Sequence, residues 1–241
     1  MKRKIYYDLI NWKNEGMKKP LMIIGARQVG KTYIIEEFCK NEFKNYISIN
    51  LLHHPEIKEL YSQSISANEK FIRMCAILDI NPNLENTIIF FDEIQESEEL
   101  ISALKWYCEV DIPFKIICAG SLLGVKLKRF HSSFPVGKVE MIHMYPMDFE
   151  EFLYAHNTGE YMVNYIQECF ENNKPMDNII HEKLNNLYRK YLCIGGMPEI
   201  VKNFIDKGSN ILNIDRKPIN NIIDSYLNDM NRYVKNKNEA T

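Results

Sequence analysis

Residues 25–32 have the types and spacing of a phosphate-binding loop. The segment reads G-A-R-Q-V-G-K-T and fits the pattern G-x-x-x-x-G-K-[ST] at every fixed position. In such a loop the glycines let backbone N–H groups point at phosphate oxygens, and the following helix adds the positive end of its dipole. We expect Lys31 to reach the β- and γ-phosphates and the Thr32 hydroxyl to hold Mg²⁺. The nucleotide-binding residues predicted from this loop are Gly25, Arg27, Gln28, Val29, Gly30, Lys31 and Thr32.

An acidic pair, Asp92 and Glu93, follows the apolar run of residues 88–91. Ligands gather at the carboxyl ends of the strands in open α/β sheets. We expect Asp92 to bind Mg²⁺ through water and Glu93 to orient and deprotonate the attacking water. Such a pair can also simply end a strand and solvate a loop, but a phosphate loop on a neighbouring strand favours the catalytic interpretation. Adjacent Asp and Glu are typical of P-loop enzymes that hydrolyse nucleotide with an acidic base.

Ser121 ends a third apolar run, residues 116–120. Its hydroxyl could bind the γ-phosphate or the attacking water, which would make it a sensor and the third catalytic candidate beside Lys31 and Glu93. Ser and Gly are also routine turn residues after strands, so this assignment depends on the two stronger motifs.

The elements that must position these residues alternate between short apolar runs and amphipathic helices over the first 145 residues. Apolar runs predict strands, and helical spacing predicts helices, of which the third follows a Ser97 cap. The alternation indicates an α/β fold with a parallel sheet between helices. The expected strands are 20–26, 45–51, 86–93, 114–121 and 138–146, and the expected helices are 31–41, 69–80 and 98–109.

Beyond residue 146 the pattern is helical only. Asp148 and Glu151 have the spacing of a capping box, and Pro198 and Pro218 stand where first-turn prolines belong. We therefore expect a P-loop core over residues 1–146 and a helical segment over 147–241.

Composition limits the other possibilities. The 241 residues carry 30 Lys and Arg against 32 Asp and Glu, a balance of −2 that argues against a broad nucleic-acid surface but leaves a local patch open. The six cysteines form no C-x-x-C pair, which favours free thiols in a reducing compartment. No signal peptide is visible and no run approaches the ~18 apolar residues of a membrane span, so we expect a cytoplasmic protein.

The base of the nucleotide is inferred from what the sequence lacks. No D-x-x-G switch and no N-K-x-D or T-K-x-D base-reading motif occurs, which favours ATP over GTP. A P-loop kinase remains an alternative, although such an enzyme would not need Glu93 directly after Asp92.

Five segments together resemble a prokaryotic family of AAA-like P-loop ATPases. They lie at residues 3–38, 88–96, 119–125, 133–153 and 191–201, and they read RKIYYDLINWKNEGMKKPLMIIGARQVGKTYIIEEF, IIFFDEIQE, AGSLLGV, SFPVGKVEMIHMYPMDFEEFL and YLCIGGMPEIV. The resemblance implies an AAA-like core of the additional-strand type, with the loop strand in the middle of the sheet, a helical lid segment, and binding of ATP with Mg²⁺. It also implies that the bulky Arg27 and Gln28 are normal in this form of the loop.

The same resemblance raises two further expectations. Family members usually continue into a C-terminal domain of unknown function, so residues 147–241 are expected to be the lid and the start of a truncated domain. AAA proteins commonly receive a basic finger from a neighbouring subunit, which makes a homo-oligomer possible. Arg129 and Lys138 are the candidate fingers.

These motifs lead to one main hypothesis and two alternatives. The main one is Mg²⁺-dependent ATP hydrolysis that drives a conformational change in an attached domain or protein partner. The first alternative is a switch that binds ATP without turnover and is linked to nucleic acid. The second is a fragment whose site is incomplete.

Overall fold

The computed structural model describes residues 1–17, 19–81, 86–110, 114–121, 135, 137–157 and 159–233, with the backbone alone for residues 229–233. The chain divides into two compact units. The first, here called the core unit, is Ile5–Met144; the second, the helical unit, combines Met1–Lys4 with Tyr145–Thr241.

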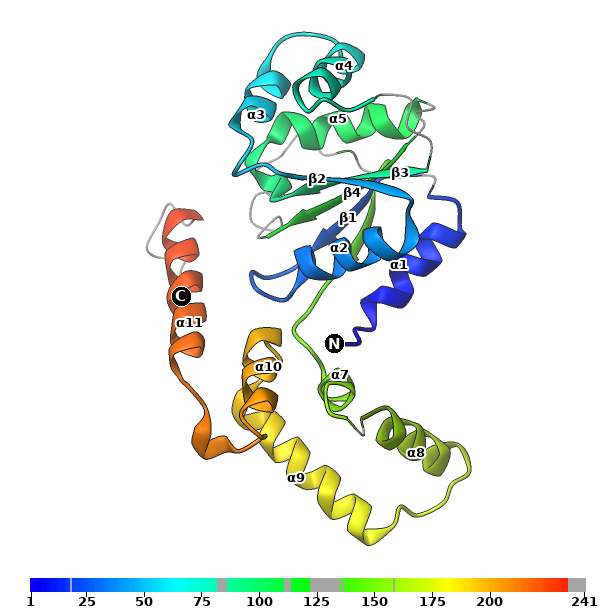
Figure 1. Cartoon of the computed structure of the whole chain (residues 1–241), viewed down its shortest axis with the longest axis vertical. Coiled ribbons are helices and arrows are strands. Elements are labelled where there is room, and N and C mark those ends of the chain that lie inside the picture. The colour runs from blue at the N-terminus through cyan, green and yellow to red at the C-terminus, as the bar shows by residue number, and fades with distance from the viewer. Residues whose placement is uncertain are drawn as a thin grey trace. The chain divides into compact units, whose positions relative to one another are not determined.

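The core unit is built on a five-stranded sheet in the order β2-β3-β4-β1-β5, and every pairing is parallel (Figure 1). This confirms the predicted parallel α/β sheet. The strand β1 lies inside the sheet, between β4 and β5, as the family resemblance implies. The strands are β1 (Leu21–Ile24), β2 (Asn45–Asn50), β3 (Thr87–Asp92), β4 (Phe114–Gly120) and β5 (Glu140–His143).

The position of β4 corrects one expectation. It pairs with β1 on one side and β3 on the other, so the strand that ends in Asp92 is not the neighbour of the strand that leads into the phosphate loop. Residues of β4 are buried on both faces, for example Ile116 and Ile117, which suits the strand to the sheet interior. This order is that of an additional-strand P-loop fold.

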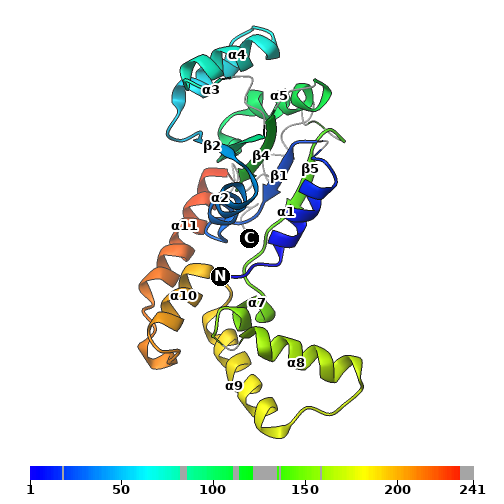
Figure 2. The same ribbon diagram turned by 45° about the vertical axis from the view of Figure 1, so that its right-hand side comes forward.

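Helices cover both faces of the sheet (Figures 1 and 2). One face carries α1 and α2, and the other carries α3, α4 and α5. The predicted cap of α5 is confirmed, because the Ser97 Oγ accepts a hydrogen bond from the Leu100 N–H at 3.2 Å. The helices are α1 (Ile5–Asn14), α2 (Lys31–Glu42), α3 (Pro55–Ser62), α4 (Ala67–Ile77) and α5 (Glu98–Glu109).

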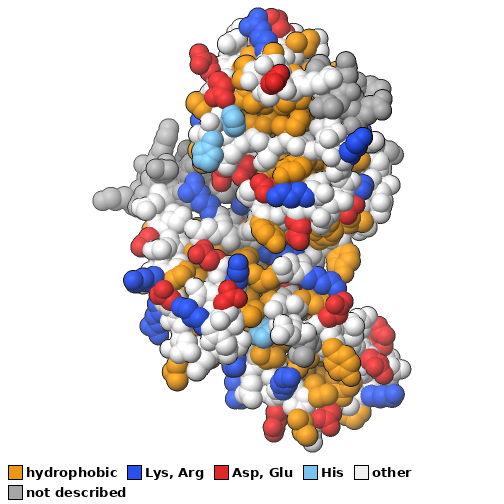
Figure 3. Space-filling view, viewed as in Figure 1, with side chains coloured by type: hydrophobic (Ala, Val, Ile, Leu, Met, Phe, Trp, Pro, Cys, Tyr) orange, Lys and Arg blue, Asp and Glu red, His pale blue; other side chains and the backbone are white. Residues whose placement is uncertain are grey.

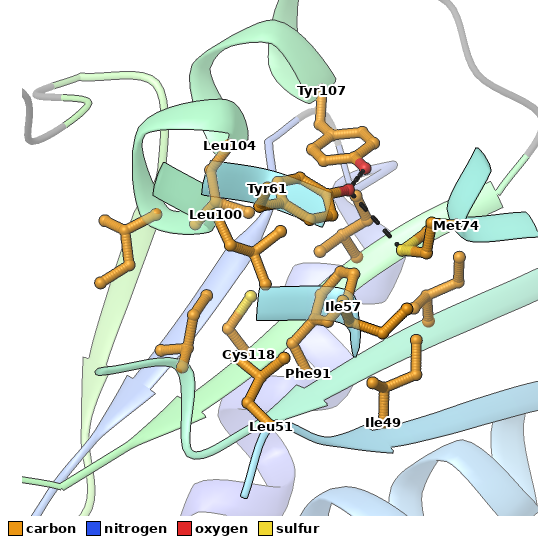
Figure 4. Packing of buried hydrophobic residues seen from close by; sticks show 14 of the residues in the cluster. Ile49, Leu51, Ile57, Tyr61, Met74, Phe91, Leu100, Leu104, Tyr107 and Cys118 are labelled. Carbon is orange, nitrogen blue, oxygen red and sulfur yellow. Dashed lines mark hydrogen bonds between the residues drawn. The ribbon is translucent and has the colours of Figure 1, made fainter. Parts of the chain in front are cut away.

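The main hydrophobic core lies between the sheet and the second group of helices (Figure 4). Side chains from β3 and β4, such as Phe91 and Cys118, pack there against α3 and α5. Two buried phenols, Tyr61 and Tyr107, hydrogen-bond each other, and the Tyr61 hydroxyl also lies 3.6 Å from the Met74 sulfur. This packing holds β3 and β4 in place, and Asp92 and Ser121 lie at the ends of these two strands.

The helical unit begins with the capping box that the sequence predicted. The Asp148 side chain accepts from the Glu151 N–H, and the Glu151 side chain accepts from the Asp148 N–H. Pro198 starts α10 and Pro218 lies in the first turn of α11, also as predicted. The helices are α7 (Phe149–Tyr154), α8 (Gly159–Glu171), α9 (Asn178–Ile194), α10 (Pro198–Asp206) and α11 (Lys217–Tyr233). Over the described ranges, the chain has no helix with the length and apolar character of a membrane span.

Candidate nucleotide-binding site

The phosphate loop connects the end of β1 to the start of α2, and its first glycine is required by a close backbone contact. A Cβ on Gly25 would lie 2.2 Å from the Met144 carbonyl oxygen, because the chain leaving β5 passes directly beside it. The Met144 N–H donates to the Ile24 carbonyl at 2.8 Å, which holds that approach in place. Any side chain at position 25 would therefore displace either the loop or the segment after β5.

Two residues of the loop adopt left-handed backbone conformations. Gln28 has a φ of 63° and Gly30 a φ of 95°. Gly30 is also the N-cap of α2 and offers no side-chain acceptor. The first-turn N–H groups of α2 thus keep their capacity to bind an anion. Arg27 is half-buried, Gln28 is exposed and Val29 is fully buried, so the loop uses Val29 as its anchor to the core.

Lys31 lies at the mouth of the loop and is only 8% exposed. Its ammonium donates to the carbonyl oxygens of Gly25 and Ala26, at 3.0 and 2.7 Å. Burial lowers the pKa of Lys31, the negative charges of Glu93 and Asp92 oppose that shift, and the Arg27 charge adds to it. The cation is therefore desolvated and held against the loop backbone, where phosphate oxygens would meet it.

Asp92 joins the end of β3 to the start of α2, across the intervening strand. Its Oδ2 accepts from the Thr32 hydroxyl at 3.0 Å and from the Asn50 amide at 3.2 Å, and its Oδ1 accepts from the Glu93 N–H at 3.0 Å. Burial raises the pKa of Asp92, the bond from Thr32 opposes the rise, and the Glu93 charge adds to it. Thr32 and Asp92, which the sequence paired as Mg²⁺ residues, are thus in direct contact although their strands are not neighbours.

Glu93 and Ser121 are linked by a residue that the sequence analysis did not single out. The buried Gln95 side chain donates to the Glu93 carboxylate and to the Ser121 Oγ, and it accepts from the Ser121 N–H. Asn50 is the second residue that was missed. It ends β2 in register with Asp92, and its position at a strand end was the only sequence signal available.

Of the two candidate basic fingers, the structure describes only Lys138. Lys138 precedes β5, whose first residue pairs with the first residue of β1, so it lies at the edge of the sheet opposite the phosphate loop. Its ammonium pairs with the Glu109 carboxylate at 3.0 Å. Lys138 therefore does not face the phosphate site of its own chain. Arg129 lies outside the described residues.

The sheet order, the loop and the acidic strand end together define the chain as an AAA-like P-loop protein of the ATPase type. A family model described as an AAA domain matches residues 17–153, which is more than half of the chain. The chain therefore belongs to this AAA domain family. The family and the site together support a function of the ATP-binding, ATPase type.

Solved structures with a related fold include the Walker-type ATPase PABY2304 of Pyrococcus abyssi. It is 18% identical with a TM-score of 0.55, and the match covers 96% of this chain and 75% of that chain. The ORC2 protein of Aeropyrum pernix, in its ADPNP-ADP complexes, is 13% identical with a TM-score of 0.44, covering 65% of this chain and 50% of that chain. The Drosophila ORC bound to DNA is 10% identical with a TM-score of 0.49, and the match covers 97% of this chain and 68% of that chain. The comparison with curated proteins gave no match.

Proposed function

We propose that the protein binds ATP with Mg²⁺ and hydrolyses it, and that turnover drives a conformational change in an attached domain or partner. The observation that carries this proposal is the 3.0 Å contact between the Thr32 hydroxyl and the Asp92 carboxylate beside Lys31. A hydroxyl from the loop helix and a carboxylate from a strand end converge there on one point.

The donor set at this point fits Mg²⁺. The ion prefers oxygen ligands, and proteins usually hold it through one or two carboxylates, water and substrate phosphates rather than in an all-protein cage. Thr32 and Asp92 supply a hydroxyl and a carboxylate, and no group of three or more His, Cys, Asp or Glu side chains that could cage an ion occurs among the described residues. When bound, Mg²⁺ would neutralise charge on the β- and γ-phosphate oxygens.

The chain's own residues would then perform the hydrolysis. Lys31 would exchange the carbonyl oxygens of Gly25 and Ala26 for phosphate oxygens, and its charge would stabilise the transferring phosphoryl group. A water oxygen would attack the γ-phosphorus while the bond to the β–γ bridging oxygen breaks and ADP leaves. The proton of that water would pass to the Glu93 carboxylate. Ser121, at the end of β4, would hydrogen-bond the γ-phosphate or the water.

Coupling to the rest of the molecule would use the chain that leaves β5. Met144 is the last residue of the core unit, and its backbone touches both Ile24 and Gly25 at the start of the phosphate loop. A loop that shifts when phosphate binds would therefore press on the segment that continues into Tyr145 and the helical unit. The moving domain would be the helical unit or a protein attached to it, as monomer or homo-oligomer.

Nucleic acid is not part of the proposal. The net charge is −2, and on the face drawn in Figure 3 the Lys and Arg side chains lie among Asp and Glu side chains rather than in one basic patch. A protein that binds nucleic acid mainly through its phosphates would carry a clustered basic surface.

Phosphate release from ATP tests the proposal. We expect turnover with Mg²⁺ but not with EDTA, and a loss of about tenfold or more in Asp92→Asn. Asp206→Asn, at an exposed position in the helical unit, is the matched control and should keep the wild-type rate. Tight ATP binding without turnover would instead support the switch that the sequence left open, and equal turnover in EDTA would exclude the metal from the reaction.

A further inference from the structure

The Gln95 side chain occupies a buried position beside the two catalytic candidates that the sequence placed on different strands. Gln95 is 2% exposed and lies in a short 3-10 turn, η1 (Ile94–Glu96), that follows β3. Ser121, at the end of β4, is also 2% exposed. A buried amide at this place needs hydrogen-bond partners, and three of its hydrogen bonds join it to Glu93 and Ser121 of the proposed site.

The partners fix which way the amide faces. The Ser121 backbone N–H can only donate, so the atom facing it at 3.1 Å must be the Gln95 Oε1. The Nε2 group then has to face the Glu93 carboxylate, to which it donates, and the Ser121 Oγ at 3.4 Å. Because the Ser121 backbone N–H sets this orientation, Glu93 meets an N–H donor rather than a carbonyl oxygen.

Glu93 is held from its backbone as well. Its φ of 54° is a left-handed conformation that is uncommon for a residue with a side chain. Its charge is the largest of the electrostatic influences that oppose the desolvation of Lys31. The carboxylate thus lies near Lys31 and is tethered to the end of β4 through Gln95.

We propose that Gln95 is a positioning residue that fixes the Glu93 carboxylate toward the γ-phosphate and ties its position to Ser121. The inference rests on the proposed function, since it assigns Gln95 a part in the hydrolysis there. Gln95 itself transfers no proton. By the same geometry, a movement of Ser121 on binding γ-phosphate would be passed to Glu93 through one amide.

Two variants separate positioning from simple support of the fold. Gln95→Ala removes the hydrogen bonds to Glu93 and to Ser121. It also leaves the buried Ser121 N–H without the Gln95 acceptor, so it can weaken the fold as well. Gln95→Glu keeps the size and the acceptor for that N–H but turns a second carboxylate toward Glu93. Two carboxylates in contact bind a proton at higher pH than one alone, and a shared proton blocks a general base.

The test is the pH profile of kcat with KM for ATP measured alongside. For Gln95→Ala we expect kcat to fall about 10- to 100-fold with KM within about twofold of wild type, since the base is misplaced while the phosphate loop stays intact. For Gln95→Glu we expect the acidic midpoint of the kcat profile to rise by about one pH unit or more. Matched controls are Gln167→Ala and Gln167→Glu, because the exposed Gln167 donates to the Glu171 carboxylate at 2.8 Å in α8. Both should match wild type.

The outcomes distinguish this inference from the function it rests on. A Gln95→Glu protein with the wild-type kcat and midpoint overturns the inference, and the proposed hydrolysis stands if Glu93→Gln is inactive in the same assay. For Gln95→Glu, an equal loss of kcat at every pH with no shift of the midpoint assigns Gln95 a structural role and also overturns the inference. A wild-type protein without hydrolysis overturns both.

Discussion

At Gly25 the absence of a single Cβ decides whether the phosphate loop can form. The Met144 carbonyl oxygen occupies the space, 2.2 Å from where that Cβ would lie, and it belongs to backbone that cannot rotate away. The glycine pattern of the loop was visible in the sequence. The reason for this glycine was not, because Met144 is far away along the chain.

We expect Gly25→Ala to lower the free energy of unfolding by about 1–3 kcal/mol, as overpacking does, and to abolish nucleotide binding. Denaturant unfolding and titration with a fluorescent ATP analogue measure the two effects. Gly208→Ala is the control, since Gly208 has a φ of 78° with nothing within 4 Å of an added Cβ. It should cost about 1–2 kcal/mol of backbone strain and leave nucleotide binding intact. Wild-type binding by Gly25→Ala would contradict the assignment.

Asp92 illustrates a site residue that works against stability. Its pKa is raised in the folded protein, chiefly by burial, so the folded state holds a proton at pH values where the unfolded chain has lost it. The nucleotide-free protein should therefore lose stability as the pH rises from about 4, the ordinary value for Asp, through the raised pKa. In Asp92→Asn this fall should be absent and the stability at neutral pH higher than in wild type.

Asp148 has a lowered pKa, so its contribution to stability should change with pH in the opposite direction to that of Asp92. Burial acts to raise its pKa, but hydrogen bonds from the Glu151 N–H and the Lys4 ammonium lower it overall. Its contribution is present at neutral pH and is lost as the pH falls, so Asp148→Asn should reduce the stability near pH 7. Thermal unfolding of the three proteins between pH 2 and 8 measures both slopes, because the Asp148 contribution is lost only below about pH 4, the ordinary value for Asp. The same slope in all three would show that neither carboxyl has the environment described.

At the scale of elements, the helical unit is fastened to the chain's N-terminus by a buried ion pair. The Arg3 Nε lies 3.1 Å from the Glu151 Oε1, and both side chains are 7% exposed. The Lys4 N–H donates to the same Oε1 at 2.7 Å, while the other carboxylate oxygen caps α7. One carboxylate thus caps a helix and also binds Arg3 and Lys4.

We expect Arg3→Ala to cost about 3–5 kcal/mol in the helical unit, because it leaves the Glu151 charge buried and unpaired. Lys2→Ala is the control, since its pair with Glu160 is exposed at 37% and 69% and should contribute under about 1 kcal/mol. Urea unfolding followed by circular dichroism measures the difference. Equal losses in the two variants would contradict a special role for Arg3.

The sequence predicted those strands and helix caps that neighbouring residues specify. It did not predict the order of the strands in the sheet. Continuous apolar runs predicted all five strands to within a few residues, and Ser97 and Asp148 predicted their caps. The helix α1 was not predicted, although Ile5, Leu9 and Trp12 have helical spacing. The insertion of β4 between β1 and β3 could not be derived from spacing, because strand order is set by packing across the sheet.

The same limit applies to the site. Lys31, Thr32 and Asp92 came from a motif whose mechanism fixes the residue types. Gln95 and Asn50 carry no such signal, since Asn at a strand end is more often a turn residue and Gln95 lies in the connection after β3. Their roles depend on the register of β2 with β3 and on the fold of η1, which bring distant side chains together.

At the scale of the whole molecule, the proposal requires communication from the phosphate loop to the helical unit. The chain passes between the units at Lys4–Ile5 and at Met144–Tyr145, and the second crossing touches the loop. We expect Mg²⁺ and ATP to change amide hydrogen exchange within Tyr145–Thr241 as well as in residues 25–32. Lys31→Ala should abolish both changes. Protection confined to residues 25–32 would show binding without coupling.

The most direct test of the account is ATP hydrolysis by Glu93→Gln. The substitution keeps the shape and polar contacts of the side chain but removes its ability to accept a proton. We predict that turnover falls by about 10²- to 10⁴-fold while the Kd for ATP stays within about threefold of wild type, so that the bound nucleotide recovered from the protein is ATP. Glu98→Gln, in the exposed first turn of α5, should hydrolyse at the wild-type rate. Hydrolysis by Glu93→Gln at the wild-type rate would contradict the assignment of this carboxylate as the base.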